Sequence, residues 1–212
     1  MNRRNFFAGL AAVGAPAIAV VGNRVSAPRN TVVRAVGEGR KNIPNVRVTS
    51  HEGKDYRFYD DLVKGKTVLI NFFYADCTGI CPRMTSNLAK IQTALGDCVG
   101  RDTFIYSISL KPQSDSPQKL SAYAGMHGIE PGSGWLLLHA SHHDMELLRE
   151  RLGFKDSDPS LDADVNQHTG ILRFGTDVYD KWSGYPLLGN VQLIAEMVRQ
   201  LDPKAPRRPL FV

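Results

Sequence analysis

The stretch that decides the fold is Val68-Leu-Ile-Asn-Phe-Phe-Tyr-Ala-Asp-Cys77-Thr-Gly-Ile-Cys81-Pro82. Its first half, Val68 to Tyr74, packs aromatic and β-branched residues together with few polar ones, which predicts a buried strand. From Pro82 to Leu95 apolar residues recur at helical spacing. Proline suits the first turn of a helix, because the amide it lacks would have no partner there. Both cysteines therefore lie between the end of a strand and the start of a helix, which is where α/β folds commonly have their binding and active sites.

This position predicts the chemistry of the two cysteines. The unpaired amides and the dipole of a helix N-terminus favour thiolate over thiol, and we expect Cys81, beside Pro82, to be affected most. Three residues separate Cys77 from Cys81, so both sulfurs can turn to one side. Such a pair can form a disulfide or bind a soft metal such as Cu(I) or Zn(II). The alternative without a function is a structural disulfide, but it would close a very small loop and add little to the stability of the fold.

The N-terminus predicts export. Arg3-Arg4 is followed by Phe6-Phe7 and an Ala/Gly/Val-rich stretch to about Val21. A basic start, a modest apolar region and small residues are typical of an export signal, and the arginine pair resembles the twin-arginine type. We expect residues 1–27 to be this signal or a short anchor, residues 28–44 a linker, residues 45–201 the folded domain, and residues 202–212 a flexible tail.

The distribution of charge argues against nucleic-acid binding, and the number of cysteines leaves one without a partner for a disulfide. The chain carries a formal charge of +5, but seven of its 26 basic residues precede Asn42 and three follow Leu201, against one acid in each segment. The middle thus has 16 basic and 19 acidic residues, a net charge of −3, which argues against a nucleic-acid surface. Three cysteines in an oxidising compartment leave at least one unpaired. We interpret Cys98, just past the predicted helix, as a bystander.

Strands and helices alternate through the middle of the chain. We expect a hairpin (Val46–Ser50 and Tyr56–Tyr59), two further strands (103–110 and 134–139), helices over 117–126 and from the cap Ser141 to about Gly153, a closing hairpin (169–174 and 178–182), and a final helix over 191–201. This order predicts an α/β fold: a thioredoxin-like sandwich with a central mixed sheet flanked by helices and an N-terminal β-hairpin extension.

Three segments resemble the Sco/SenC family: Asn71 to Pro82, Ser109 to Leu120 with Asp115-Ser-Pro117, and Asp164-Val-Asn-Gln-His168. The resemblance runs from about Val46 to Leu201. It implies a copper-binding, thioredoxin-like protein on the periplasmic side that assists assembly of the dinuclear copper centre of cytochrome oxidase. By position, Cys77 and Cys81 match the family's metal-binding cysteines, and His168 matches its histidine ligand. The chain departs from the family at Lys111-Pro112, where an acidic residue often precedes the proline, so a partner contact that needs this acid is not expected.

A separate argument also favours His168 as a ligand. Thioredoxin-like oxidoreductases generally place a cis-proline beside the cysteine pair, before the strand that opens the final hairpin. Here the nearest upstream proline is Pro159, and a histidine stands in about that place. Two thiolates and one imidazole make a soft site for Cu(I), and Cu(II) is accepted with an added ligand. The bland alternative is a strand-end histidine that only forms hydrogen bonds.

Other candidates have ordinary interpretations that we favour. His139, His142 and His143 could form a second metal cluster, but they fit a strand end and the exposed first turn of a helix. Met84 could offer a thioether, but methionine at this spacing is usually core. Asp162 and Asp164 could tune the site or face a partner, but they fit solvated loop acids.

The sequence thus predicts a periplasmic copper-binding protein that assists copper-centre assembly by metal transfer, by reduction of acceptor cysteines, or by both. The expected partners are an apo copper-centre subunit of cytochrome oxidase or another exported cuproprotein, and a periplasmic copper donor. We expect the protein to work close to the membrane, and to be tethered to the inner membrane if its N-terminal segment is retained. One alternative is a thiol-disulfide oxidoreductase without a metal role, in which Cys77 and Cys81 are the redox pair. Another is a copper sensor or store. A peroxidase-like enzyme would need a cysteine environment that the sequence does not display.

Overall fold

The computed structural model describes residues 43–156, 158–163 and 170–201. Its strands are β1 (Arg47–Ser50), β2 (Asp55–Arg57), β3 (Thr67–Phe73), β4 (Thr103–Ser109), β5 (Trp135–Ala140), β6 (Ile171–Thr176) and β7 (Lys181–Pro186). Its helices are α1 (Cys81–Leu95), α2 (Pro117–Met126), α3 (His142–Arg151), α4 (Pro159–Ala163) and α5 (Val191–Arg199), with short helical turns η1 (Phe58–Val63), η2 (Gly96–Cys98) and η3 (Asp177–Tyr179).

The strands form a single mixed sheet in the order β2-β1-β5-β4-β3-β6-β7. β3, β4 and β5 are parallel, whereas β1 and β6 pair antiparallel to their neighbours. Every residue of β3 is buried, as expected for a strand covered by helices on both faces. The β1–β2 hairpin extends one edge of the sheet. This arrangement confirms the predicted thioredoxin-like fold with a mixed central sheet and an N-terminal hairpin.

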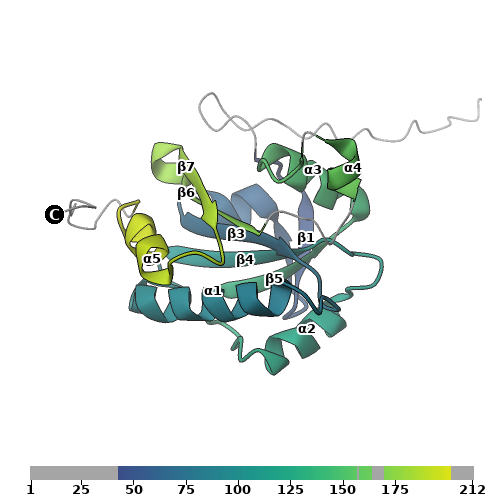
Figure 1. The fold of residues 1–212 in the computed structure, drawn as a ribbon, viewed down its shortest axis with the longest axis horizontal. Coiled ribbons are helices and arrows are strands. Elements are labelled where there is room, and N and C mark those ends of the chain that lie inside the picture. The colour runs from purple at the N-terminus through teal and green to yellow at the C-terminus, as the bar shows by residue number, and fades with distance from the viewer. Residues whose placement is uncertain (1–42, 157, 164–169, 202–212) are drawn as a thin grey trace, which may run out of the picture. The chain divides into compact units, whose positions relative to one another are not determined.

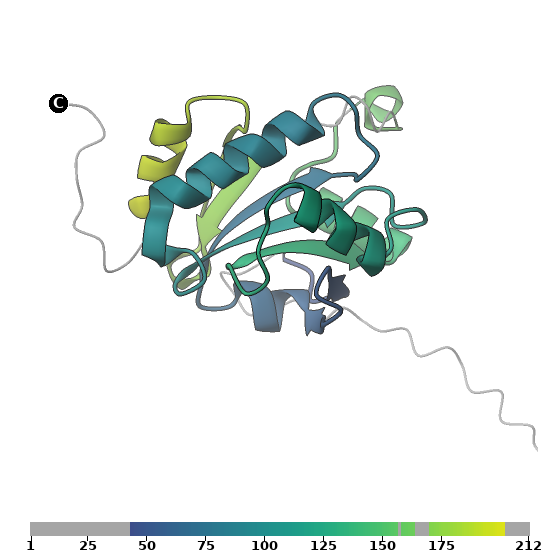
Figure 2. The same cartoon turned by 90° about the horizontal axis from the view of Figure 1, so that it is seen from below.

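Helices cover both faces of the sheet. Figures 1 and 2 show α1, α2 and α5 on one face and α3 and α4 on the other. Neighbouring residues of β3 point to opposite faces. Phe73 therefore packs on Tyr123 of α2, with ring centroids 5.2 Å apart, and Phe72 packs on Phe154, which follows α3, at 4.7 Å. The end of β3 is thus held from both sides by aromatic contacts.

The helix boundaries follow local signals. Ser116 and Ser141 cap α2 and α3, and their hydroxyls accept the amides of Lys119 at 3.3 Å and Asp144 at 3.1 Å. These contacts confirm the expected starts of both helices. Within the described residues, no helix combines the length and the apolar character needed to cross a membrane.

Two predicted strands differ from the structure. The predicted strand Tyr56–Tyr59 ends at Arg57, because Phe58–Val63 forms a π-helical turn that buries Phe58, Tyr59, Leu62 and Val63. The predicted strand 178–182 begins only at Lys181. Asp177–Tyr179 is a 3-10 turn, and Asp180 adopts a left-handed conformation with φ 49° that interrupts the extended chain. The short helix α4 was not predicted.

Candidate metal centre

The two cysteines occupy a bend between β3 and α1, residues 74–80. The Cys77 amide donates to the Tyr74 carbonyl at 3.2 Å, which turns the chain directly after the strand. The helix begins at Cys81 with Pro82 in its first turn, as predicted. Its N-cap residue is Ile80, whose side chain supplies no capping hydrogen bond. The first amides of α1 therefore remain available to an acceptor from the bend.

Cys77 supplies that acceptor. Its sulfur accepts hydrogen bonds from the backbone amides of Gly79 and Cys81 and also hydrogen-bonds the Cys81 side chain. Both residues are buried: Cys77 is 9% exposed and Cys81 is fully enclosed. The structure has no disulfide between them. The bend thus directs both sulfurs to one side at the start of a helix, as the three-residue spacing predicts.

The expectation that Cys81 is the more acidic thiol is wrong. Burial raises the pKa of Cys81 to about 12, and the hydrogen bond with Cys77 contributes to this because it keeps the proton on Cys81. Burial also acts to raise the pKa of Cys77, but the hydrogen bonds from Cys81 and from the Gly79 amide outweigh it, so the pKa of Cys77 is lowered. The sulfur of Cys77 faces the first amides of α1, whereas that of Cys81 lies within the core.

Polar and aromatic side chains surround the pair. Thr85, one turn into α1, donates from its hydroxyl to the Cys81 carbonyl at 3.0 Å and shares a hydrogen bond with the Tyr123 hydroxyl at 2.8 Å. Burial raises the pKa of Tyr123 to about 12, so this phenol stays protonated at neutral pH. On the bend itself, the Lys111 ammonium lies 3.9 Å from the centre of the Tyr74 ring.

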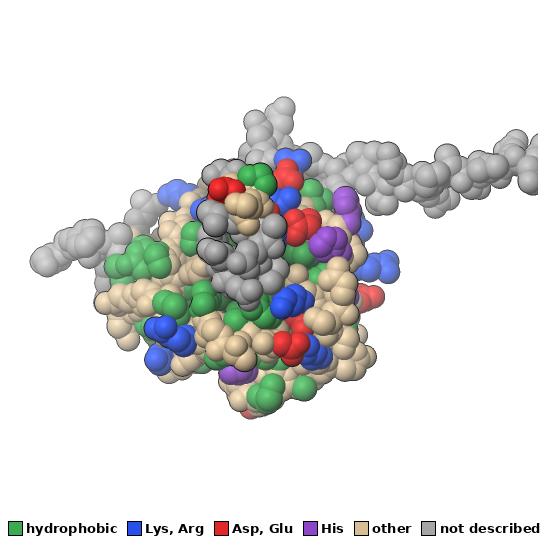
Figure 3. Space-filling view, turned by 45° about the vertical axis from the view of Figure 1, so that its right-hand side comes forward, with side chains coloured by type: hydrophobic (Ala, Val, Ile, Leu, Met, Phe, Trp, Pro, Cys, Tyr) green, Lys and Arg blue, Asp and Glu red, His purple; other side chains and the backbone are tan. Residues whose placement is uncertain are grey.

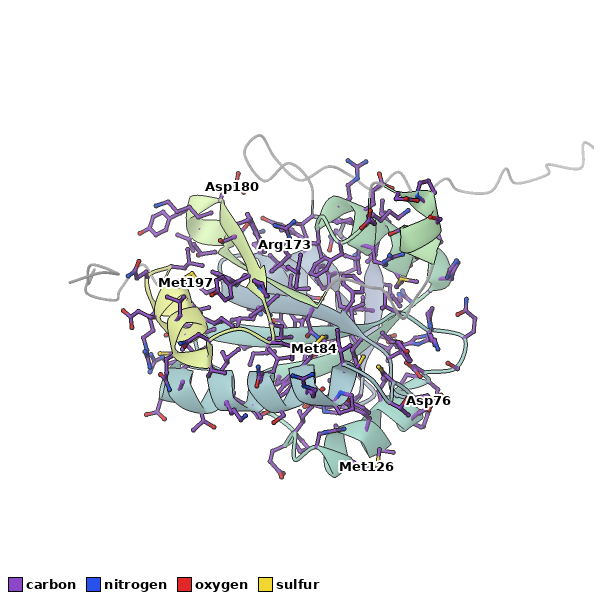
Figure 4. The ribbon with its side chains drawn as sticks, viewed as in Figure 1. Asp76, Met84, Met126, Arg173, Asp180 and Met197 are labelled. Atoms are coloured by element: carbon purple, nitrogen blue, oxygen red, sulfur yellow. The ribbon has the colours of Figure 1, made fainter. Side chains whose placement is uncertain are left out.

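Residues 109–119 support the cysteine bend from a separate segment, and the sequence did not predict this contact. Asp115 is 1% exposed, and its carboxylate accepts the Ala75 amide at 3.0 Å. Lys119 lies 3.2 Å from Asp115 and 2.5 Å from Asp76. Figure 4 labels Asp76 on the loop that leads into α1 and Met84 further along that helix. The sequence contains Asp115-Ser-Pro117 as a helix start, but nothing local indicates that this acid contacts the cysteine bend.

The predicted third ligand, His168, lies outside the described residues, as does Asp164. The next described residue, Gly170, borders the start of α1. A Cβ atom added to Gly170 would lie 3.1 Å from Ile80 Cδ1 and 3.7 Å from Met84 Sδ. In the described part of the chain, no group of three His, Cys, Asp or Glu side chains is arranged to hold a metal ion. The structure therefore brings together the two sulfurs and leaves the imidazole a prediction.

The remaining histidines and Met84 match their ordinary interpretations. His139 Nδ1 lies 3.0 Å from the Asp115 carbonyl oxygen, at the end of β5. His142 and His143 are exposed at the start of α3. Met84 is 1% exposed and belongs to the core.

The interpretation of Cys98 agrees with the structure, and that of Asp162 does not. Cys98 is half-buried on η2, beyond the far end of the 15-residue helix α1, which spans about 22 Å at the helical rise per residue. This placement agrees with its interpretation as a bystander. Asp162 is not a solvated loop acid: it lies in α4, and its carboxylate binds Arg149 at 2.7 Å.

Comparison with known proteins finds a family match to the N-terminal part of the described chain. The family model described as SCO1/SenC matches residues 42–130, which contain both cysteines, α1 and α2. Over 67 residues the chain is 34% identical to the SCO1 protein homolog of Bacillus subtilis (strain 168), a stretch that covers 32% of this chain and 34% of that relative. Over residues 42–130, which carry both cysteines, the chain matches the SCO1/SenC family.

Solved Sco structures share the fold of this protein. Bradyrhizobium japonicum ScoI with copper bound matches with a TM-score of 0.58 and 21% identity, over 74% of this chain and 96% of that one. BsSco, described as a member of the Sco family of cytochrome c oxidase assembly proteins with a disulfide switch, matches with a TM-score of 0.61 and 21% identity, over 76% and 92%. At these identities the likeness concerns the fold.

The donor set of this protein fits a soft metal ion. Thiolate sulfur is the ligand type that selects Cu(I), and binding requires both thiols to lose their protons. Cys77 is predisposed to do so by its pKa, and Cys81 would release its proton only in exchange for the metal. The matched segment, 42–130, contains both cysteines and ends before His168, so the family match does not extend to the histidine.

Proposed function

We propose that this protein binds copper through Cys77, Cys81 and His168 in the periplasm and assists assembly of the copper centre of a cytochrome c oxidase. The copper is cargo, passed by ligand exchange to cysteines of the apo subunit. The observation that carries the proposal is the hydrogen-bonded thiol pair, directed to one side and almost closed to solvent at the start of α1. A solved relative of the same fold has copper bound, and another is described as a cytochrome c oxidase assembly protein.

Chain connectivity supports His168 as the third ligand. The peptide links from Gly170 to His168 span at most about 7.6 Å between Cα atoms. Gly170 is anchored beside the site, because its carbonyl accepts the Leu187 amide at 2.7 Å and its Cα side faces Ile80 and Met84. The imidazole therefore belongs to a residue that the chain keeps within reach of the helix bearing Cys81.

The location in the proposal rests on the N-terminal sequence. The Arg3-Arg4 pair and the following apolar run are the features that favour export, with a retained segment as the alternative that would keep the protein at the inner membrane. A fusion of residues 1–27 to a reporter that is active only after export tests this. Replacing both arginines by lysine should abolish export if the twin-arginine interpretation is correct.

A second function is favoured by the unequal thiols. The lowered pKa of Cys77 suits a nucleophile that attacks an acceptor disulfide, and the buried Cys81 suits the thiol that resolves the mixed disulfide. In that reaction the acceptor disulfide gains two electrons and Cys77 and Cys81 become a disulfide. An external reductant must then restore them. The same sulfurs can serve both functions, and a protein with only this activity would not need His168.

Anaerobic Cu(I) titration of the reduced protein separates the two functions. We expect roughly one copper per chain, because two thiolates and an imidazole complete a single soft site. Cys77→Ala and Cys81→Ala should lose tight binding. His168→Ala should bind more weakly while still forming the disulfide, and His143→Ala, at an exposed position, serves as the matched control. Unchanged copper affinity in His168→Ala would leave thiol-disulfide exchange as the better function.

A further inference from the structure

Asp115 is a buried charge that the proposed function does not use. Its carboxylate Oδ2 accepts hydrogen bonds from the Ser109 hydroxyl at 2.7 Å and from the Ala75 amide at 3.0 Å. Its Oδ1 faces the Lys119 ammonium at 3.2 Å. A buried carboxylate is costly unless it is paired and hydrogen-bonded, so a position that retains one needs a reason.

Two of the partners of Asp115 connect it to the two residues that precede Cys77. Ala75 is held through its amide, and Asp76 is held by Lys119, which Asp115 also binds. Within the bend, the Cys77 amide donates to the Tyr74 carbonyl, and the Gly79 and Cys81 amides donate to the Cys77 sulfur. Asp115 and Lys119 add support from a separate segment of the chain. Figure 3 shows positively and negatively charged side chains interspersed on one face of the molecule.

The segment that carries Asp115 is itself rigidly attached to the sheet. The Leu110 amide donates to the Phe73 carbonyl at 2.8 Å, and the Asp115 amide donates to the Lys111 carbonyl at 2.8 Å. On the other side, His139 of β5 contacts the Asp115 carbonyl at 3.0 Å. The carboxylate therefore has a fixed position relative to the end of β3, from which the bend departs.

We infer that Asp115 is a positioning residue for Cys77: its fixed carboxylate holds the bend so that both sulfurs face one side before copper arrives. Preorganised donors bind more tightly because the cost of ordering them is met during folding. The inference rests on the proposed copper function for its consequence, but the effect on the shape of the bend exists without metal. Asp115 acts through Ala75 and is assigned no contact with copper.

The test compares Asp115→Ala and Asp115→Asn with a matched control, Asp177→Ala. Asp177 is likewise buried, at 4% exposed, and accepts the Gly65 amide at 2.8 Å and the Tyr59 hydroxyl at 3.0 Å. It lies at the other end of β3, about 20 Å away along the strand. Any general effect of deleting a buried carboxylate is shared by the control, whereas an effect on the bend is not.

We expect Asp115→Ala to weaken Cu(I) binding at least tenfold in anaerobic competition titrations, at a temperature where the variant is folded. Asp115→Asn keeps an oxygen that can accept the Ala75 amide and should recover part of this loss. The second readout is the ratio of the alkylation rates of Cys77 and Cys81 in the reduced, metal-free protein. This ratio should move toward one in Asp115→Ala and stay at the wild-type value in Asp177→Ala.

The inference is overturned if Asp115→Ala and Asp115→Asn keep the wild-type alkylation ratio, or if Asp177→Ala changes it as much. A wild-type protein that fails to bind copper would overturn the proposed function instead, and the alkylation ratio would still decide the role of Asp115. If Asp115→Ala does not fold, the measurements on Asp115→Asn decide.

Discussion

Gly170 lies directly against Met84 of α1, so a side chain at position 170 would meet the helix that carries Cys81. A Cβ atom at Gly170, the residue before β6, would lie 3.7 Å from Met84 Sδ and 3.1 Å from Ile80 Cδ1. This contact joins the first turn of α1 to the chain that leads back to His168. It is the structural link on which the proposed three-ligand site depends.

Substitution of Gly170 tests that link. Gly170→Ala brings a methyl group to 3.1 Å from Ile80, a flexible side-chain end that can shift, so we expect less than about 1 kcal/mol of destabilisation. Gly170→Val should cost about 1–3 kcal/mol and also weaken copper binding, because the added methyl groups press the first turn of α1 away from β6. Urea unfolding and copper titration of both variants measure this. Equal copper affinity in Gly170→Val and wild type would show that the contact does not support the site.

The two thiols should react in a fixed order. Because the pKa of Cys77 is lowered and that of Cys81 is raised to about 12, Cys77 has far more thiolate at pH 7–8. Iodoacetamide should modify Cys77 first, and its rate should rise with pH at lower values than for an ordinary thiol. Peptide mapping by mass spectrometry at several pH values follows both sites. Faster modification of Cys81 would contradict this assignment.

The side chain of Cys81 contributes to the lowered pKa of Cys77. In Cys81→Ala, the hydrogen bond to the Cys77 sulfur is lost, so the pKa of Cys77 should rise toward its ordinary value. Cys81→Ser keeps a hydroxyl donor and should retain most of the lowering. The pH dependence of Cys77 alkylation in the two variants gives the comparison.

Copper should stabilise the reduced protein selectively. A ligand that binds only the folded state adds RT ln(1 + [L]/Kd), which is about 2.7 kcal/mol at a free concentration of 100 Kd. Reduced Cys77 and Cys81 can both bind the metal, whereas a disulfide between them cannot. We therefore expect copper to raise the melting temperature of the reduced form and leave that of the oxidised form nearly unchanged. Equal shifts in the two forms would exclude binding through the thiolates.

The acid stability of the domain should depend on Glu146. Burial acts to raise the pKa of Glu146, but the hydrogen bonds and charges of Arg149 and Lys155 outweigh it and lower the pKa below its ordinary value of 4.5. Since the folded pKa is the lower one, the ion pairs stabilise the protein fully above the unfolded pKa. That contribution is lost as the pH falls through the folded pKa.

Glu146→Gln should therefore be less stable than wild type at pH 7, by about 0.5–1 kcal/mol for these partly exposed pairs. The difference should shrink as the pH is lowered below 4. Glu150→Gln is the matched control, since Glu150 is 58% exposed and lies 4.0 Å from Lys155. Urea unfolding at pH 7 and near pH 3 measures both variants. A difference for Glu146→Gln that is independent of pH would be inconsistent with a lowered pKa.

The strand, the bend and the helix that carry the cysteines could be predicted from the sequence because their signals are local. A buried strand, two cysteines, a helix-starting proline and an apolar period all lie between Val68 and Leu95, and both elements were found there. The alternation of strands and helices also determined the fold class. His168 stays a prediction from sequence, because it lies outside the described residues.

Tertiary structure decided the relative acidity of the two thiols and the side-chain contacts between segments that are distant in the sequence. Which thiol is more acidic follows from burial and from the direction of each sulfur, and the local rule about helix N-termini selected Cys81 instead of Cys77. Asp115 and Ala75 are 40 positions apart, and Asp162 meets Arg149 across a turn between two helices. Desolvation and hydrogen bonding depend on which segments the folded chain brings together. The local pattern of neighbouring residues does not predict these long-range contacts.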